Sequence, residues 1–152
     1  MTITVNLVTV ANSIANLSIS GVNVKDINQI PESALSTLPV FYPRPNEFIT
    51  NLKWSRETYG TDATAAMNLT YVLHYHYLHA VVGSAGSLLS VYSGLITNLI
   101  KILKAIFEDS NPDGAVDMTL VSISSVGVLT DPAGEVKYHG VEISLKVTEY
   151  IQ

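Results

Sequence analysis

This chain has no cysteine and few charged residues, and each of these facts excludes some classes of protein. Without cysteine there is neither a disulfide framework nor a thiolate metal site. Charged residues make up 14% of the 152 residues, against about 25% in a typical soluble domain. Only eight residues are lysine or arginine and the net charge is −5, which argues against the clustered basic surface that holds nucleic acid.

The chain also has no long apolar run. Its longest purely apolar stretch is a few residues, and Lys101 and Lys104 interrupt the most apolar segment. We therefore expect no membrane-spanning helix and no membrane partner. The first residues, Met1 to Val5, lack the basic start of a signal peptide. A protein that is made and used in the cytoplasm is expected.

Apolar residues, in contrast, are abundant. They make up 47% of the sequence, and 152 residues suit a single domain (1–152) with a core of ordinary size. A monomer with so few charges has little polar surface with which to cover itself. We expect the remaining apolar surface to be covered by contact with copies of the chain or with partners.

Residues 66 to 110 hold the two clearest periodicities of the sequence. From Met67 to Tyr77, apolar and aromatic residues alternate with mostly polar ones, which predicts a strand with one buried face. After a glycine-containing turn, residues 84 to 110 predict an amphipathic helix that lies on a sheet. Its apolar face is expected to comprise Leu88, Tyr92, Leu95, Ile96, Leu99, Ile102, Leu103 and Ile106.

The rest of the chain predicts one more helix and four more strands. Residues 3 to 17 favour a helix, with a strand as the alternative because many of them are β-branched. Strands are predicted at 22 to 30, 48 to 58, 116 to 128 and 141 to 148, the third with a bulge near Val121 where its alternation slips. The prolines between Leu38 and Pro45 predict an extended connector or a sheet edge.

These elements define the expected fold class. It is α+β, in the order α-β-β-β-α-β-β, with a mainly antiparallel sheet packed against a long amphipathic helix. The segment Asp131-Pro132-Ala133-Gly134 is expected to form a turn, because proline presets φ and glycine closes the turn.

Two candidate metal sites lack a complete set of ligands. His74, His76 and His79 form an H-x-H-x-x-H pattern, but only the first two share a strand face, and no Asp or Glu lies within ten residues of them. The segment from Asp109 to Asp117 begins like a calcium loop, but Pro112 interrupts it and Leu120 stands where a bidentate glutamate belongs. We predict that no metal is bound.

Other chemistry-bearing patterns are also missing. The segment Gly83-Ser84-Ala85-Gly86-Ser87 lacks the lysine of a phosphate loop and the G-x-G-x-x-G pattern, so Ser84 or Ser87 is expected to cap the following helix. There is no G-x-S-x-G elbow and no Ser/His/Asp set at a suggestive spacing. We expect neither a cofactor nor enzymatic activity.

The aromatic-rich middle of the chain is interpreted as an interface between subunits. Base stacking would need more basic residues than Arg44, Lys53 and Arg56, whereas protein interfaces favour aromatics with a few arginines. The prolines between Pro31 and Trp54 block regular sheet pairing, so the apolar side chains there are expected to need a partner. The predicted interface residues are Leu38, Val40, Phe41, Tyr42, Arg44, Phe48, Trp54 and Arg56.

Several segments, in this order, resemble the tail terminator proteins of long-tailed bacteriophages. They are the N-terminal helix, the Leu38-Pro39-Val40 connector, the strand from Trp54 to Gly60, the alternating strand from Met67 to His79, the helix at 84 to 110 and the closing strand from Tyr138 to Ile143. The resemblance covers nearly the whole chain, and it is one of pattern and element order rather than of a specific motif.

The resemblance implies a structural virion protein of the tail or neck. Such proteins form a hexameric ring on the head-proximal end of the tail tube, stop its polymerisation and dock to a head-tail connector or head-completion protein. DNA passes through the lumen without specific binding, and there are no catalytic residues to carry over. The alternatives are another phage neck or head-completion protein, or a small α+β ligand-binding domain or enzyme, which would have a concave pocket lined by convergent polar groups.

Overall fold

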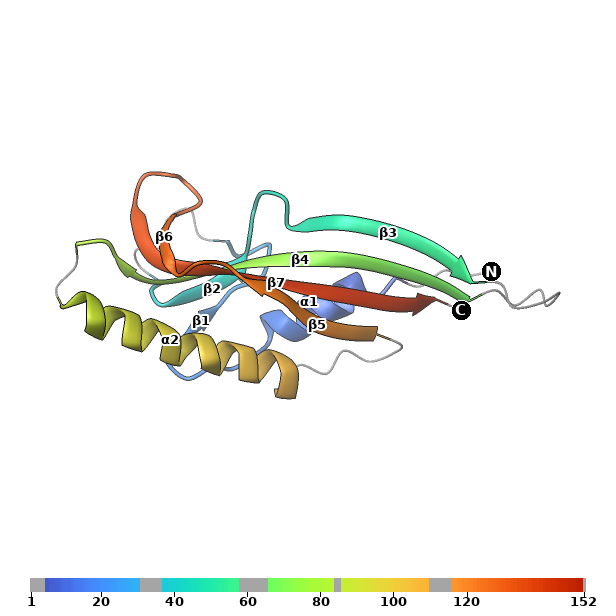
Figure 1. The fold of residues 1–152 in the computed structure, drawn as a ribbon, viewed down its shortest axis with the longest axis horizontal. Helices are drawn as coiled ribbons and strands as arrows, with labels where there is room; N and C mark the ends of the chain where they lie inside the picture. The colour runs from blue at the N-terminus through green and yellow to red at the C-terminus, as the bar shows by residue number, and fades with distance from the viewer. Residues whose placement is uncertain (1–4, 31–36, 58–65, 84–85, 110–115, 152) are drawn as a thin grey trace.

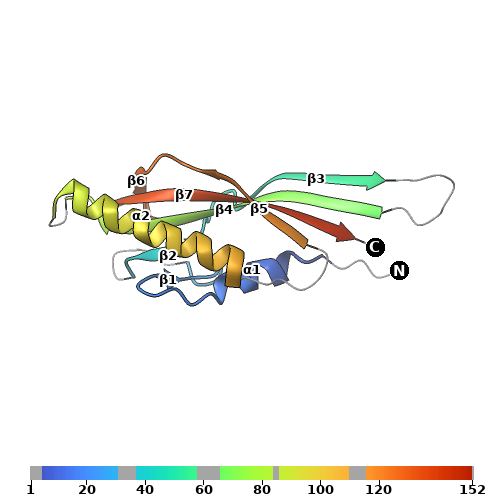
Figure 2. The same ribbon diagram turned by 60° about the horizontal axis from the view of Figure 1, so that its bottom comes forward.

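A computed structural model describes residues 5–30, 37–57, 66–83, 86–109 and 116–151. They form an α+β fold in which two helices lie on one face of a mixed seven-stranded sheet (Figures 1 and 2). In chain order the elements are α1 (Leu7–Ala15), β1 (Asn23–Val24), β2 (Val40–Pro43), β3 (Ile49–Glu57), β4 (Ala66–Val81), α2 (Leu88–Lys104), its π-helical continuation η1 (Ala105–Asp109), β5 (Val116–Ile123), β6 (Gly127–Thr130) and β7 (Lys137–Ile151).

Two long strands, β4 and β7, form the centre of the sheet. They pair antiparallel from Met67 opposite Ile151 to Val81 opposite Tyr138. Both β2 and β3 pair antiparallel with β4, while β5 and β6 pair antiparallel with β7. The short β1 pairs parallel with β2. At about 3.3 Å per residue, the 16 residues of β4 extend over about 50 Å.

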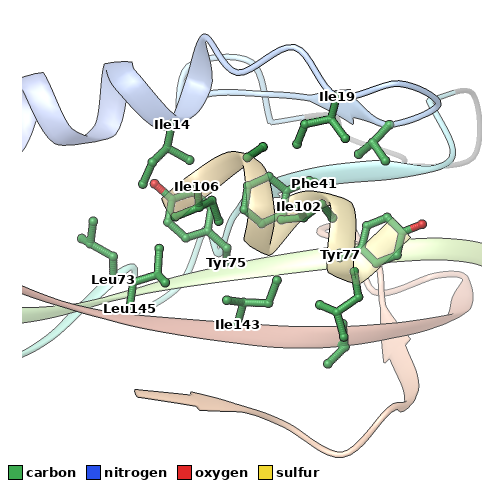
Figure 3. Packing of buried hydrophobic residues seen from close by; sticks show 14 of the residues in the cluster. Ile14, Ile19, Phe41, Leu73, Tyr75, Tyr77, Ile102, Ile106, Ile143 and Leu145 are labelled. Carbon is green, nitrogen blue, oxygen red and sulfur yellow. The ribbon is translucent and has the colours of Figure 1, made fainter. Parts of the chain in front are cut away.

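The main core lies between the central strands and the two helices (Figure 3). Alternate residues of β4 and β7 are at most 1% exposed on this side: Tyr71, Leu73, Tyr75, Tyr77, Val141, Ile143, Leu145 and Val147. The helices cover them with Val10, Ile14, Leu95, Leu99, Ile102 and Ile106. The alternation predicted for both strands is therefore confirmed, as is the buried stripe from Leu95 to Ile106.

The predicted inner face of α2 is wrong at two positions. Leu88 is 64% exposed and Ile96 is 50% exposed. Ile96 directly follows the buried Leu95, and a helix turns about 100° per residue, so Ile96 lies beside the buried stripe rather than on it. Leu88 belongs to the first turn of the helix. Ser87 caps this turn by accepting a hydrogen bond from the Ser90 N–H at 3.2 Å, and it is one of the two residues predicted as the cap.

The prolines around residue 40 do not produce an open connector. Val40–Pro43 forms β2, whose four residues are all buried, and Arg44 then continues its pairing by donating its N–H to the His74 carbonyl. The predicted strand at 22–30 shrinks to the two residues of β1, and the residues after it form turns. The strand predicted at 116–128 divides into β5 and β6, with the expected irregularity between Leu120 and Ser122.

Two close approaches fix the packing around β4. Gly140 of β7 lies opposite Leu78, and a Cβ at this glycine would come within 2.3 Å of the Tyr77 carbonyl oxygen. On the helix side, a Cβ at Gly94 would meet the His79 ring at 3.1 Å.

The turn predicted at 131–134 is present, and it is closed by a hydrogen bond from the Gly134 N–H to the Asp131 carbonyl. The turn expected at 59–62 lies outside the described residues.

Candidate functional site: a polar cluster, two sheet edges and a helix face

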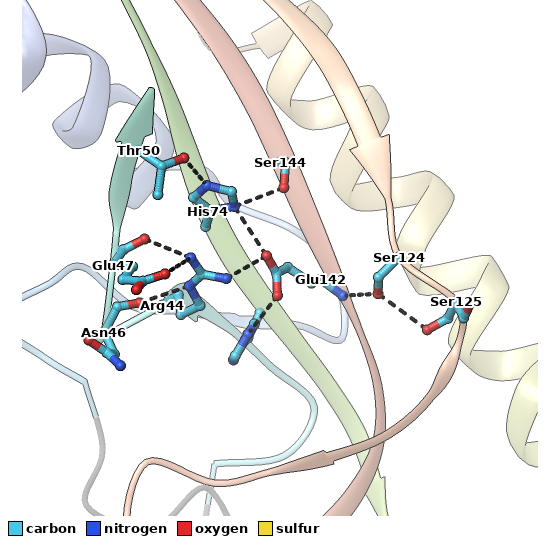
Figure 4. Close-up of polar contacts among 10 residues, drawn as sticks. Arg44, Asn46, Glu47, Thr50, His74, Ser124, Ser125, Glu142 and Ser144 are labelled. Atoms are coloured by element: carbon cyan, nitrogen blue, oxygen red, sulfur yellow. Dashed lines mark hydrogen bonds and ion pairs between the residues drawn. The ribbon is translucent and has the colours of Figure 1, made fainter. Parts of the chain in front are cut away.

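The sheet face opposite the helices carries a polar cluster of six residues, Arg44, Thr50, His74, His76, Glu142 and Ser144 (Figure 4). It connects β3, β4, β7 and the residue after β2. The Arg44 guanidinium donates to Glu142 at 2.7 Å and to the backbone carbonyls of Asn46 and Glu47 at 2.8 and 2.9 Å. These bonds tie the β2–β3 connection to the central strands.

The histidines of the cluster complete its hydrogen bonding. One nitrogen of His74 lies 2.6 Å from the Thr50 hydroxyl, and the other lies 2.9 Å from Ser144 and 3.1 Å from Glu142. His76 lies 3.4 Å from the second carboxylate oxygen of Glu142. Glu142 is thus shared by one guanidinium and two imidazoles, and it is the central residue of the cluster.

Burial and charge act in opposite directions on these groups. Burial raises the pKa of Glu142, but Arg44 and the two histidines act against it and leave that pKa below its usual value. Burial lowers the pKa of His76 more than the neighbouring Glu142 raises it, and Arg44 and His74 lower it further. The cluster therefore favours an ionised carboxylate beside a neutral His76 at neutral pH.

The carboxylate partner of the two histidines, Glu142, was not predicted from the sequence. His76 pairs with Glu142 and His74 with Ser144 across β4 and β7, so the acidic residue comes from a strand that is distant in sequence. Within the described part of the chain, no group of three His, Cys, Asp or Glu residues is arranged to hold a metal ion. His79 lies apart and contacts the Tyr77 hydroxyl at 2.7 Å. The candidate calcium loop lies largely outside the described residues.

A cavity of about 330 Å³ adjoins the polar cluster. Arg44, His76 and Asp131 contribute its ionisable lining together with Glu47. These groups already have partners within the chain, because Arg44 binds Glu142 and Asp131 accepts the Glu135 N–H at 3.0 Å. The cavity walls are thus held by internal bonds.

Three of the predicted interface residues belong to the interior of the subunit. Val40 and Phe41 are 0% exposed and Tyr42 is 1% exposed. Phe41 stacks on Tyr75 with ring centroids 4.9 Å apart, and Val40 and Tyr42 pack with Leu78 and Tyr138 in a second, smaller core on the opposite sheet face. The prediction that these three side chains need a partner subunit is wrong, because β2 pairs with β4 and its own chain covers both faces.

The other predicted interface residues are distributed unevenly. Leu38 and Phe48 are partly buried against the two cores, and Arg44 is held in the polar cluster. Trp54 is 60% exposed and Arg56 is also exposed, both on β3. Of the eight residues, Trp54 and Arg56 are therefore the ones that a partner can reach most fully.

Two of the outer strands of the sheet, β3 and β5, expose apolar side chains, and of these the sequence pointed only to Trp54. Within the described residues, β3 pairs only with β4 and β5 only with β7, so each has one unpaired edge. On β3, Ile49, Leu52 and Trp54 are 37–65% exposed, and on β5, Leu120, Val121 and Ile123 are 38–52% exposed. An open strand edge with apolar side chains is a ready template for another chain.

The outer face of α2 and η1 is a third exposed apolar surface. Leu88, Leu89, Ile96, Ile100 and Phe107 are all at least 43% exposed. The segment Leu88–Glu108 is long and apolar enough to cross a membrane by length and composition alone. Core helices of folded domains meet the same criterion, and here the opposite stripe packs on the sheet through Leu95, Leu99 and Ile102.

The sequence was compared with protein-family models and with curated proteins. No protein-family model matches the chain, and no curated protein matches it significantly.

Proposed function

We propose that this chain is a structural subunit of a bacteriophage tail that closes into a ring at the head-proximal end of the tail tube. In this role it ends tube polymerisation and provides a docking surface for the head connector. It has no catalytic turnover, and it needs neither metal nor cofactor. The ring is expected to be a homohexamer in the virion neck, with DNA passing through the lumen.

The observation that carries the proposal is the exposed apolar surface on three separate elements. Leu52 and Trp54 on β3, Val121 on β5 and Leu89 on α2 are between 52% and 83% exposed. Monomeric proteins rarely expose large contiguous apolar patches, and such patches mark protein interfaces. Because the surfaces lie on opposite edges and on one face of the sheet, a single symmetric contact between two copies leaves some of them uncovered. A closed ring, with its further contacts to tube and connector, covers more of them.

The direct test is the size of the purified chain in solution. Sedimentation across protein concentration and salt, followed by electron microscopy, should give closed rings of uniform diameter. Addition of assembled tail tubes should place these rings at one tube end and stop further growth. A chain that stays monomeric at high concentration, even beside assembled tubes, would contradict the proposal.

A small-ligand site is the second candidate, and the cavity beside Arg44 and His76 favours it. Its volume of about 330 Å³ lies at the lower end of the range for ligand pockets. The ring takes precedence because Arg44 and Asp131 are already bonded within the chain. A thermal-shift screen with small anions tests this alternative, since a shift that is lost in Arg44→Gln would support it.

A further inference from the structure

We propose that neighbouring copies of this chain join through their sheet edges, with β3 of one copy pairing antiparallel to β5 of the next. The inference rests on the proposed ring and names the contact that closes it. Both strands have one edge without a partner among the described residues, and their lengths are matched, with nine residues in β3 and eight in β5.

The strand directions of the sheet permit this joint without rearrangement. Along β3, β4, β7 and β5 each strand runs antiparallel to its neighbour, so β3 and β5 run in opposite directions. Rotation about an axis parallel to the strands leaves all of these directions unchanged. The β5 of a rotated copy therefore arrives beside β3 in the antiparallel sense, and the alternation continues around the ring.

The two edges also carry opposite charges at the same level of the sheet. Lys53 pairs with Thr70, Thr70 with Thr148, and Thr148 with Asp117, so these four residues form one row across the sheet. The row begins with a base on β3 and ends with an acid on β5. In the described residues neither Lys53 nor Asp117 makes an ion pair within its own subunit, although the Asp117 carboxylate accepts a hydrogen bond from the Tyr150 hydroxyl at 2.8 Å.

Joining two copies in this register places Lys53 of one opposite Asp117 of the next. Opposite charges at facing positions stabilise an antiparallel pair, whereas like charges destabilise it. A two-fold contact of β3 with β3 would instead bring together Lys53 and Arg56 from both copies. Exposed apolar residues accompany the charges on each edge, with Trp54 on β3 and Leu120 on β5. The charges thus select a head-to-tail contact over a symmetric one.

Irregular positions on both strands limit the extent of the joint. The pairing of β3 with β4 shifts between Thr50 and Lys53, where Asn51 has a φ of 54°, and the pairing of β5 with β7 shifts between Leu120 and Ser122. Such bulges interrupt a strand edge. The regular segments on either edge are Lys53–Glu57 and Val116–Leu120, and in this register they face each other at Lys53 with Asp117 and at Trp54 with Val116.

A charge-reversal cycle tests the joint. Lys53→Glu and Asp117→Lys should each place like charges opposite one another and weaken assembly about fivefold or more, while the double variant should return to the parent affinity within about twofold. Lys104→Glu and Glu135→Lys are matched controls, because they make the same charge changes at exposed positions away from the two edges. Single variants that assemble like the parent, or a double variant without recovery, would overturn the inference.

Cross-linking provides the second measurement, and it benefits from the absence of native cysteine. Thr50→Cys on β3 and Thr119→Cys on β5, which lie in one row across the sheet through Val72 and Lys146, are treated with a short bis-maleimide, alone and mixed. Cross-linked dimers should form only in the mixture. Dimers from Thr50→Cys alone would indicate a symmetric contact and refute the joint. Cysteine variants that form rings but give no cross-link in the mixture overturn this inference alone, whereas a parent that is monomeric under every condition overturns the proposed ring itself.

Discussion

The centre and the edges of the sheet differ in the burial of their side chains and in the pairing of their strands. On the helix side of β4 and β7, Tyr75, Ile143 and their neighbours are almost completely buried, and these two strands give each other a full set of pairing partners. On β3 and β5, Trp54 and Val121 are more than half exposed and one strand edge is unpaired in the described structure. The centre accounts for the fold of one chain, whereas in the proposed ring the edges make the contact with another copy.

The largest expected effect is on folding stability, and it comes from comparing a buried and an exposed position of α2, Leu99 and Ile96. Leu99→Asp should destabilise the subunit by about 4 kcal/mol or more, because it places an unpaired charge against the core. Ile96→Asp, at a 50% exposed position of the same helix, should change the free energy of unfolding by no more than about 0.5 kcal/mol. Denaturant unfolding measures both, and equal destabilisation would mean that the buried face of α2 is assigned incorrectly.

The next effect separates folding from assembly. Phe41→Ala removes a fully buried ring that stacks on Tyr75 and should cost about 3–5 kcal/mol of folding stability. Trp54→Ser, at an exposed position of β3, should leave the melting temperature nearly unchanged and reduce the sedimenting mass. Circular dichroism and sedimentation on the same samples distinguish the two outcomes. A stable Phe41→Ala subunit that fails to assemble would restore the interface originally expected at β2.

A smaller effect concerns a buried carboxylate that joins α1 to the sheet. Glu149 is 0% exposed, and it accepts hydrogen bonds from the Tyr71 hydroxyl at 2.7 Å and from the Asn6 backbone N–H at the start of α1. Glu149→Ala should destabilise the subunit by about 2–3 kcal/mol, since two donors lose their hydrogen-bond acceptor. Glu135→Ala is the exposed control. Unchanged amide protection in α1 after Glu149→Ala would contradict this anchoring role.

The smallest effect is a loss of stability in acid. Burial lowers the pKa of His76, so below about 6.5 the unfolded chain binds a proton that the folded chain resists, and stability falls as the pH decreases. The lowered pKa of Glu142 acts in the same direction below 4.5, where its contribution is lost as the carboxylate becomes protonated. The melting temperature should decrease from pH 7 to pH 5, with a shallower slope in His76→Gln. A steeper slope in that variant would contradict the assignment.

The sequence predicts those parts of the molecule whose signal is local. Alternation identifies the buried face of β4 and β7, a three-and-four spacing identifies Leu95, Leu99 and Ile102, and a slip in alternation identifies the irregularity in β5. Each of these follows from residues that are adjacent along one element. The exposure of Ile96 was missed because α2 has apolar residues on both its inner and outer faces.

What the sequence could not supply depends on strand register. Glu142 lies opposite His76 only because β4 and β7 pair in one particular alignment, and neither strand encodes that alignment by itself. The same holds for the row from Lys53 to Asp117. Val40, Phe41 and Tyr42 were assigned to an interface because the prolines suggested an extended connector or a sheet edge, whereas pairing with β4 places all three in the interior.

Amide hydrogen exchange at two protein concentrations tests the central claim most directly. Amides in β4 and β7 should be protected equally at low and high concentration, because their partners lie in the same subunit. The amides of β3 and β5 that point away from β4 and β7, toward the open edges, should exchange rapidly in dilute solution and become protected together as rings form. Edge amides whose exchange rates do not depend on concentration, measured while the sedimenting mass increases, would contradict the claim that these edges join the subunits.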